Sequence, residues 1–274
     1  MNHHRVSIRE LAGWGFDDYE YRPKVSGSEA PSKAAAVIAR RSSLSQSNTV
    51  LAAETEVLRH GFETYAKRED LLSEMSGLTW SLGVVDLRAL IAFQRRLSFD
   101  PRSAQPSVPT AGDWPALLKL SFGSPKPVEC EMFHDRSAKT VTLRSSNPNL
   151  HLRVAMDPTH PLIVHGGGPF FEVALFRDRW FLRDGYHRAY ALLQAQVFAV
   201  PAVIVEAKTI EELGADQPWF FPDEVLFSTT PPRVVDFLNE DLVLQYDRPA
   251  LIKTIRIEME ETLSPAALTD RDTV

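Results

Sequence analysis

Cysteine is nearly absent from this sequence: Cys130 is the single one among 274 residues. One thiol excludes an intramolecular disulfide and any zinc site built from several cysteines. The first residues, MNHHRVSIREL, lack the apolar stretch of a secretory signal. Apolar runs such as Ala89–Phe93 are far shorter than the about 20 residues of a membrane helix. We therefore expect a cytoplasmic protein without a membrane partner.

The sequence also lacks an excess of positive charge. It has 30 Lys and Arg residues and 36 Asp and Glu residues, so its formal net charge is −6. This balance argues against a protein that holds nucleic acid nonspecifically through a wholly basic surface. A local basic patch remains compatible with it. The 44% hydrophobic content is ordinary for a globular protein, and the length allows one large domain or a core domain with extensions.

A seven-residue apolar repeat near the N-terminus comprises Leu51, Leu58, Tyr65 and Leu72. This spacing predicts one long amphipathic helix over Thr49–Met75. Its apolar stripe requires a covering surface, which is either the body of the same chain or a second copy in a homodimer.

Shorter segments follow, with turn residues between them. Val84–Leu97 is predicted to begin as a strand and continue as a helix. Gly166–Gly168 fits either a flexible lid or a plain loop, since no Gly-Lys-Ser/Thr phosphate-loop signature follows it. Alternating patterns predict an inserted β-meander and one later strand, over Leu117–Phe122, Pro127–Phe133, Thr140–Arg144, Leu150–Val154 and Thr254–Met259.

The stretch Phe171–Val205 is the most informative part of the chain. It predicts a hairpin, a glycine corner, a helix from about residue 185 to 196, and a final strand. Asp184 is a good N-cap type, and Gly185 allows a ligand to approach the backbone closely. His187 and Arg188 lie in the first helical turn, where free N–H groups and the helix dipole favour phosphate. A purely structural cap, corner and solvated arginine fit the same residues.

Around the motif Asp-Gly-Tyr-His-Arg, residues 184–188, the chain resembles the core of the ParB/sulfiredoxin superfamily. The resemblance rests on Pro161–Val164, the hairpin, the motif and the strand Val200–Val205, and it covers about residues 161 to 206. Val84–Leu87 is also similar to the first strand of such domains. The resemblance implies nucleotide phosphate contacts from Gly185, Tyr186, His187 and Arg188, catalysis by Asp184 and His187, and Mg²⁺ binding by Asp184.

The motif also separates the branches of that superfamily. Tyr186 stands where sulfiredoxins carry a cysteine, so repair of sulfinic acid is not expected. Tyr186-His187 replaces the Glu-Arg of the ParB motif, and no helix-turn-helix segment is evident downstream. The Asp-Gly-x-His-Arg form is most similar to ParB-like free serine kinases, which transfer phosphate from a nucleotide to a small hydroxyl compound.

These observations predict an α+β protein with a ParB/sulfiredoxin-like core over residues 81–210. An N-terminal helical extension, residues 1–80, and a C-terminal extension, residues 211–274, are expected to pack on it. The predicted function is binding of a nucleotide through its phosphate groups, with a nucleoside triphosphate or diphosphate and Mg²⁺ as cofactors. Whether the protein is also an enzyme is left open: phosphoryl transfer to a small-molecule acceptor and nucleotide hydrolysis are the two candidate reactions. Glu172 is a weaker acid–base candidate than Asp184.

Two alternatives from other classes remain open. The first is a DNA-associated module with a basic surface. The second is a non-enzymatic interaction scaffold with a degenerate pocket, which assembles through the seven-residue apolar repeat. The DNA alternative predicts exposed positive charge around Arg177, Arg179, Arg183 and Arg188.

Overall fold

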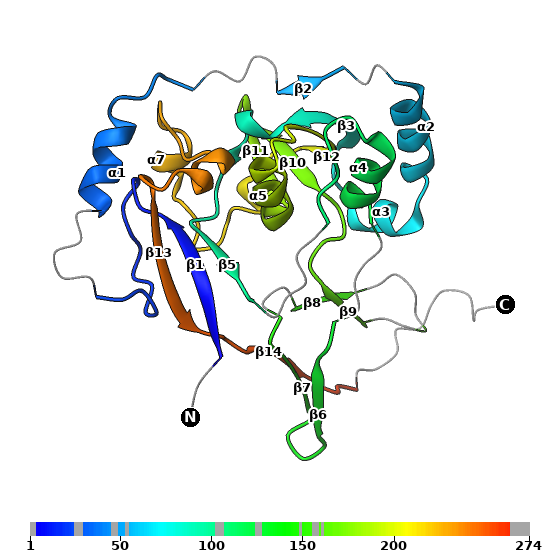
Figure 1. Cartoon of the computed structure of the whole chain (residues 1–274). Helices are drawn as coiled ribbons and strands as arrows, with labels where there is room; N and C mark the ends of the chain where they lie inside the picture. Colours follow the sequence, from blue (N-terminus) through cyan, green and yellow to red (C-terminus); the bar gives the residue numbers. More distant parts are fainter. Residues whose placement is uncertain are drawn as a thin grey trace. The chain divides into compact units, whose positions relative to one another are not determined.

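The computed structural model describes residues 4–24, 30–44, 49–52, 55–101, 107–123, 128–147, 150–154, 159 and 162–263. Helices and strands are mixed along the chain, which confirms the α+β class (Figure 1). The chain forms two compact units. Unit 1 comprises Met1–Pro125 and Gly168–Ala250, and unit 2 comprises Lys126–Gly167 and Leu251–Val274. Both units are therefore assembled from stretches that are far apart in the sequence. The division into segments 1–80, 81–210 and 211–274 stays a prediction.

A six-stranded sheet forms the centre of unit 1. Its longest strand, β12, runs antiparallel to β3 and parallel to β10, and β10 forms an antiparallel hairpin with β11. Residues 200 to 205 of β12 are all buried, so both faces of this strand are covered. The order in the sheet is β2 (Val50–Leu51), β3 (Trp80–Asp86), β12 (Ala199–Glu206), β10 (Glu172–Phe176), β11 (Arg179–Asp184) and β4 (Ile91–Ala92).

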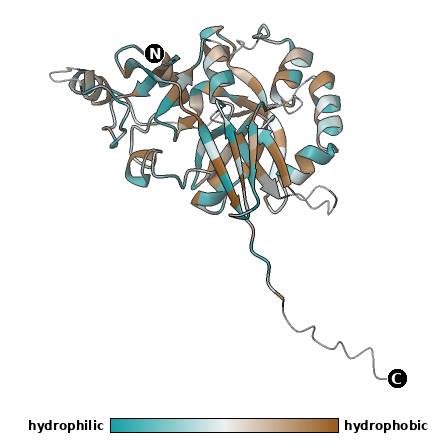
Figure 2. Ribbon diagram, turned by 90° about the horizontal axis from the view of Figure 1, so that it is seen from below, coloured by the Kyte–Doolittle hydropathy of each residue, from teal (hydrophilic) through white to brown (hydrophobic). Residues whose placement is uncertain are grey.

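Helices supply the apolar side chains that complete this core. The helices combine hydrophobic and hydrophilic residues (Figure 2), as expected where one face packs inward. The side chains of Thr55 and Asp113 cap α2 and α4 by accepting from backbone N–H groups of the first turn. The helical elements of unit 1 are α1 (Ala30–Ile38), α2 (Glu56–Tyr65), α3 (Glu69–Glu74), η1 (Leu87–Ala89), α4 (Trp114–Ser121), α5 (Tyr186–Gln194), α6 (Ile210–Leu213), α7 (Asp223–Leu226) and η2 (Val234–Leu238).

A second sheet of unit 1 pairs a strand near the N-terminus with a strand at residues 243–249. Strand β1 (Arg5–Leu11) lies between β13 (Val243–Pro249) and β5 (Arg96–Phe99), antiparallel to both. The buried carboxylate of Glu10 on β1 accepts hydrogen bonds from the side chains of Arg22, Arg96 and Tyr246. Its charge is thereby paired, as burial requires.

Unit 2 is built from antiparallel strands. Strand β7 (Thr140–Ser145) pairs with β6 (Glu131–Asp135) on one side and with β14 (Lys253–Glu258) on the other. A separate hairpin consists of β8 (Leu150–Val154) and β9 (Leu162–Gly166). The strands predicted at residues 140–144, 150–154 and 254–259 are confirmed. Residue 127 of the predicted second strand and residue 161 of the superfamily resemblance lie outside the described residues.

Three sequence predictions are wrong. The long helix at 49–75 is the short strand β2 followed by α2 and α3, and residues 66–68 separate the two helices. The helix expected within 84–97 is instead η1 followed by β4 and β5, because the backbone of Ile91 and Ala92 pairs with β11. The strand expected at 117–122 lies mostly in α4, which begins after the capping residue Asp113.

Candidate functional site around residues 184–188

The motif lies where β11 leads into α5, as the sequence predicted. Asp184 is the last residue of β11, and Gly185 is the N-cap residue of α5. The expectation that Asp184 caps the helix is wrong, since no side chain caps α5. The Oδ1 atom of Asp184 accepts a hydrogen bond from the neighbouring N–H of Gly185 at 2.5 Å.

Gly185 is required by two features of its surroundings. Its φ angle of 99° lies in the left-handed region that disfavours residues with a side chain. A Cβ atom at this position would lie 2.8 Å from Cδ2 of Phe171. The space beside the Gly185 α-carbon is thus filled by a ring of the same chain, on the side where a Cβ atom would lie. The predicted close approach of a ligand to this backbone stays a prediction.

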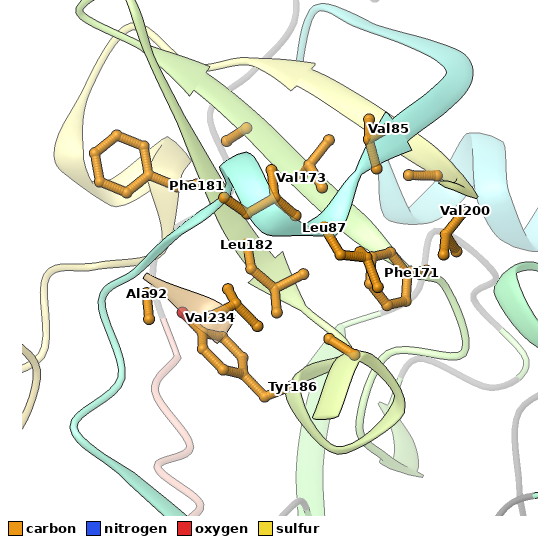
Figure 3. Packing of buried hydrophobic residues seen from close by; sticks show 14 of the residues in the cluster. Val85, Leu87, Ala92, Phe171, Val173, Phe181, Leu182, Tyr186, Val200 and Val234 are labelled. Carbon is orange, nitrogen blue, oxygen red and sulfur yellow. The ribbon is translucent and has the colours of Figure 1, made fainter. Parts of the chain in front are cut away.

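Tyr186 points from the start of α5 into the apolar core, close to Leu182 and Val234 (Figure 3). Its hydroxyl oxygen accepts hydrogen bonds from the backbone N–H groups of Phe93 at 3.0 Å and Gln94 at 3.4 Å. Burial raises the pKa of the Tyr186 phenol above its ordinary value. These contacts give Tyr186 a packing role, and its predicted nucleotide contact stays a prediction.

Arg188 uses its guanidinium to hold three backbone carbonyl groups. Nη1 donates to the carbonyl oxygens of Pro169 at 2.8 Å and Leu120 at 3.2 Å, and Nη2 donates to that of Phe170 at 2.6 Å. These bonds join α5 to the end of α4 and to the segment before β10. Burial lowers the pKa of Arg188, and the negative charges of Asp184 and Glu172 oppose this change. Both terminal nitrogens of Arg188 therefore donate to backbone carbonyl groups that hold the fold together.

His187 lies in the first turn of α5 and remains exposed at the surface. Its Nε2 atom is 2.9 Å from the carbonyl oxygen of Ser98, so Nε2 carries the proton and Nδ1 of the neutral ring is an acceptor. Phe99 packs against the ring at 5.4 Å between centroids. Desolvation by these neighbours lowers the pKa of His187 below its ordinary value. The Nε2–H donor of His187 is thus already engaged within the chain, and its predicted phosphate contact and catalytic role stay predictions.

A pair of carboxyl groups lies beside the motif. Glu172 on β10 and Asp184 on β11 are direct partners across the hairpin, because a β-bulge shifts the register between Glu172 and Val173. A Cβ atom on Gly168 would lie 2.6 Å from Oδ2 of Asp184 and 3.4 Å from Oε1 of Glu172. Oxygens of both carboxyl groups therefore face the Gly168 α-carbon.

Burial raises the pKa values of both carboxyl groups above their ordinary range. Glu172 is only 4% exposed, and burial raises its pKa to about 7, with a further increase from Asp184 and an opposing effect from Arg183. Arg183 donates to Oε2 of Glu172 through Nη1 and to the carbonyl of Glu212 through Nε. Burial also raises the pKa of Asp184, although Arg188 and the N–H groups of Gly185 and Gly168 favour its charged form.

Glu172 is a weaker candidate than Asp184 in the sequence, and Gly168 is not recognisable there as part of the site. Its only signal was the glycine triplet, which ends at Gly168 just before β10. The bulge that sets Glu172 opposite Asp184 has no signature in the sequence. Apolar and polar residues alternate along this hairpin as they do in a hairpin without a bulge. The pairing of these residues thus came from the structure.

The predicted Mg²⁺ role of Asp184 has little support in this geometry. Among the described residues, no three His, Cys, Asp or Glu side chains are grouped so that they could hold a metal ion. The oxygens of Asp184 and Glu172 already receive N–H donors from Gly185, Gly168 and Arg183. Mg²⁺ binding stays a prediction, and these donors argue against it.

The four arginines named for the DNA alternative do not present a common basic surface. Arg179 donates to the carbonyl groups of residues 226, 227 and 228, and Arg183 and Arg188 are engaged as described above. Arg177 is exposed and pairs with Asp223 at 3.4 Å. All four guanidinium groups are therefore engaged by acceptors of their own chain, and of the four only Arg177 is exposed.

Two cavities of unit 1 lie away from the motif. One, of about 270 Å³, is lined by Arg5, Ser7, Phe99, Asp100, Pro101 and Asp247. The other, of about 400 Å³, is lined by residues of two loops, at 41–44 and 230–233. Neither of these two cavities has a lining residue from 184–188.

Comparison with protein families, curated proteins and solved structures gave no match. In the described part of the chain, every helix is too short or too polar to cross a membrane.

Proposed function

We propose that unit 1 is a ParB/sulfiredoxin-like nucleotide-binding domain whose Glu172–Asp184 pair is the acid–base centre for phosphoryl transfer or nucleotide hydrolysis. The observation that carries this proposal is the position of the two carboxyl groups, directly opposite each other across a bulged hairpin. Like charges in that arrangement are unfavourable, so the pair favours a shared proton. Bulges and perturbed pKa values both concentrate at active sites.

The pKa of Glu172 suits a proton acceptor at neutral pH. With a pKa of about 7, the carboxyl group is deprotonated in about half of the molecules at pH 7. A base of this pKa can take a proton from an attacking hydroxyl group and release it readily afterwards. In the proposed reaction, a hydroxyl oxygen of water or of an acceptor attacks phosphorus and its proton passes to the pair. The bond from phosphorus to the nucleotide leaving oxygen then breaks.

The start of α5 supplies the phosphate-binding element of the proposal. Asp184 immediately precedes Gly185, and α5 begins at Tyr186. The first N–H groups of a helix have no partner within the helix, and the positive end of its dipole attracts phosphate. Arg183 and Arg188 interact with the two carboxyl groups and offset their negative charge. A phosphate can therefore lie near the pair without strong net repulsion.

The arrangement of strands supports the superfamily assignment. The hairpin β10–β11, the glycine corner, α5 and β12 follow one another in the order that the resemblance implies. Strand β3, which contains most of the segment compared with the first superfamily strand, lies beside β12 in the sheet.

A thermal-shift screen with ATP, ADP, CTP, GTP and inorganic phosphate, each with and without Mg²⁺, tests binding. A ligand at about 100 times its dissociation constant should add about 2.7 kcal/mol to the free energy of unfolding. Release of phosphate from the bound nucleotide is then followed against pH. We expect Glu172→Gln to retain the thermal shift while the release rate falls by about 100-fold or more.

The control is Glu206→Gln, a change at the exposed end of β12. It should leave both binding and the rate unchanged. Arg188 is unsuitable as a test of ligand binding because its loss would disturb the fold. Absence of a thermal shift with every nucleotide, or a release rate that Glu172→Gln and Asp184→Asn leave unchanged, would reject the proposal.

A further inference from the structure

The larger of the two cavities described above is lined chiefly by polar and positively charged residues. Its walls are the loop that follows α1 and the loop that leads into η2. The backbone N–H of Leu44 donates to the carbonyl of Thr229 at 3.0 Å, and the indole of Trp14 donates to the carbonyl of Thr230 at 2.8 Å. The first of these bonds joins the two loops, and the second holds the loop at residue 230 against the segment that follows β1. The cavity is lined by Arg41, Ser42, Ser43, Leu44, Thr230, Pro231 and Arg233.

Arg41 is engaged with a buried carboxylate. Its Nη1 and Nη2 atoms donate to the two oxygens of Asp236 at 2.8 and 2.7 Å. Asp236 is only 2% exposed, and one of its oxygens also accepts from the backbone N–H of Arg233 at 2.8 Å. The negative charge of Asp236 is therefore neutralised by Arg41.

Arg233 presents a second guanidinium that lacks such a partner. Its Nε atom lies 3.9 Å from Asp236, beyond hydrogen-bond distance, and its side chain is 37% exposed. Within the described residues, no acceptor is hydrogen-bonded to this guanidinium. Its backbone is nevertheless fixed, because Arg233 forms a bridge with Ile91 and the next N–H donates to Leu90 at 3.0 Å. The donor group is thus anchored at the cavity with its hydrogen-bonding capacity unused.

We propose that this cavity binds the phosphate group of a small phosphorylated molecule. Two arginines and one aspartate leave one positive charge in excess, and no acidic residue is among those that line the cavity. A guanidinium offers a planar fork of donors that matches phosphate oxygens. The hydroxyl groups of Ser42, Ser43 and Thr230 add donors that can rotate toward such a ligand.

The size of the cavity agrees with this ligand class. Its volume of about 400 Å³ lies within the range of small-molecule sites, which extends from about 300 to 1,000 Å³. Leu44 and Pro231 offer apolar surface for the body of the molecule. Because none of these residues belongs to the Glu172–Asp184 centre, the proposal stands independently of the proposed function.

Calorimetric titration of the full chain with inorganic phosphate and with ribose 5-phosphate tests the site, with ribose as the uncharged control ligand. We expect saturable binding of ribose 5-phosphate, none of ribose, and affinity that falls as ionic strength rises. Arg233→Gln should weaken binding by about tenfold or more. Arg233→Lys should give an intermediate affinity, since it keeps the charge without the fork.

Arg177→Gln is the matched control, because Arg177 is an exposed arginine elsewhere in unit 1. It should bind as the unaltered protein does. Asp184→Asn distinguishes the two sites, since it should leave binding in this cavity intact whether or not nucleotide binds at α5. Absence of saturable binding of both phosphate ligands, or equal binding by the Arg233→Gln and Arg177→Gln variants, would overturn the inference.

Discussion

The α-carbon of Gly185 faces the ring of Phe171 so closely that a Cβ on residue 185 would lie 2.8 Å from Cδ2 of the ring. Gly185→Ala should therefore combine left-handed backbone strain with steric overlap. We expect a loss of about 2 to 5 kcal/mol in the free energy of unfolding, as measured by urea denaturation.

Gly77 provides the comparison for that substitution. Its φ angle is 82°, but nothing lies within 4 Å of a Cβ built there, so Gly77→Ala should cost only about 1 to 2 kcal/mol. Phe171→Leu should recover part of the loss in a Gly185→Ala background. If Gly185→Ala and Gly77→Ala lower the free energy of unfolding equally, steric overlap with Phe171 does not destabilise the Gly185→Ala variant.

Arg188→Lys should destabilise unit 1 although it preserves the charge. A lysine ammonium cannot reproduce the fork that reaches the carbonyl oxygens of Leu120, Pro169 and Phe170. Leaving buried carbonyl groups without donors should cost about 2 to 4 kcal/mol, measured by urea denaturation. Arg177→Lys, at an exposed position, should change the free energy of unfolding by less than about 0.5 kcal/mol.

Tyr186→Phe should leave two backbone N–H groups without their acceptor while the ring stays in the core. The hydroxyl oxygen accepts from Phe93 and Gln94, so its removal should cost about 1 to 3 kcal/mol. Thermal unfolding and nucleotide titration measured on the same sample separate stability from binding. A variant of unchanged stability that has lost nucleotide binding would instead give Tyr186 the ligand contact that the resemblance implies.

The stability of unit 1 should depend on pH through Glu172. Folding raises the pKa of this carboxyl group from 4.5 to about 7, so the folded state binds its proton more tightly than the unfolded state does. The resulting stabilisation is fully present below about pH 4.5 and is lost as the pH rises through about 7. Its size is on the order of 3 kcal/mol.

Urea denaturation at about pH 5 and about pH 8 measures this effect. Glu172→Gln carries a permanently neutral side chain and should lose less stability across that interval than the unaltered protein, whereas Glu206→Gln should follow the unaltered protein. The same pH dependence in all three proteins would show that Glu172 does not titrate in this range.

The sequence located the motif correctly because its signals are local. A glycine between an apolar strand and a helical pattern specifies a corner, and β11, Gly185 and α5 follow that order. The errors arose where tertiary contacts decide the structure. Residues 91 and 92 are extended because they pair with β11, and that strand is about ninety positions away in the sequence.

The chemical roles of the site residues were harder to predict than their positions. Arg188 is equally well suited to phosphate and to carbonyl oxygens, and only the positions of residues 120, 169 and 170 reveal its acceptors. The raised pKa of Glu172 depends on burial and on a bulge, and periodicity reveals neither. Sequence patterns therefore indicate where a site lies more reliably than which atoms act in it.

The last two strands of the described chain, β13 and β14, are synthesised after the strands with which they pair. Strand β13 completes the sheet around β1, and β14 completes the sheet around β7, yet both are made after nearly all of their partners. Until residues 243–258 leave the ribosome, a nascent chain has a β1 strand and a β7 strand that each lack one neighbour. Such unpaired edges are prone to aggregation. The growing chain should therefore depend most on chaperones until residues 243–258 have left the ribosome.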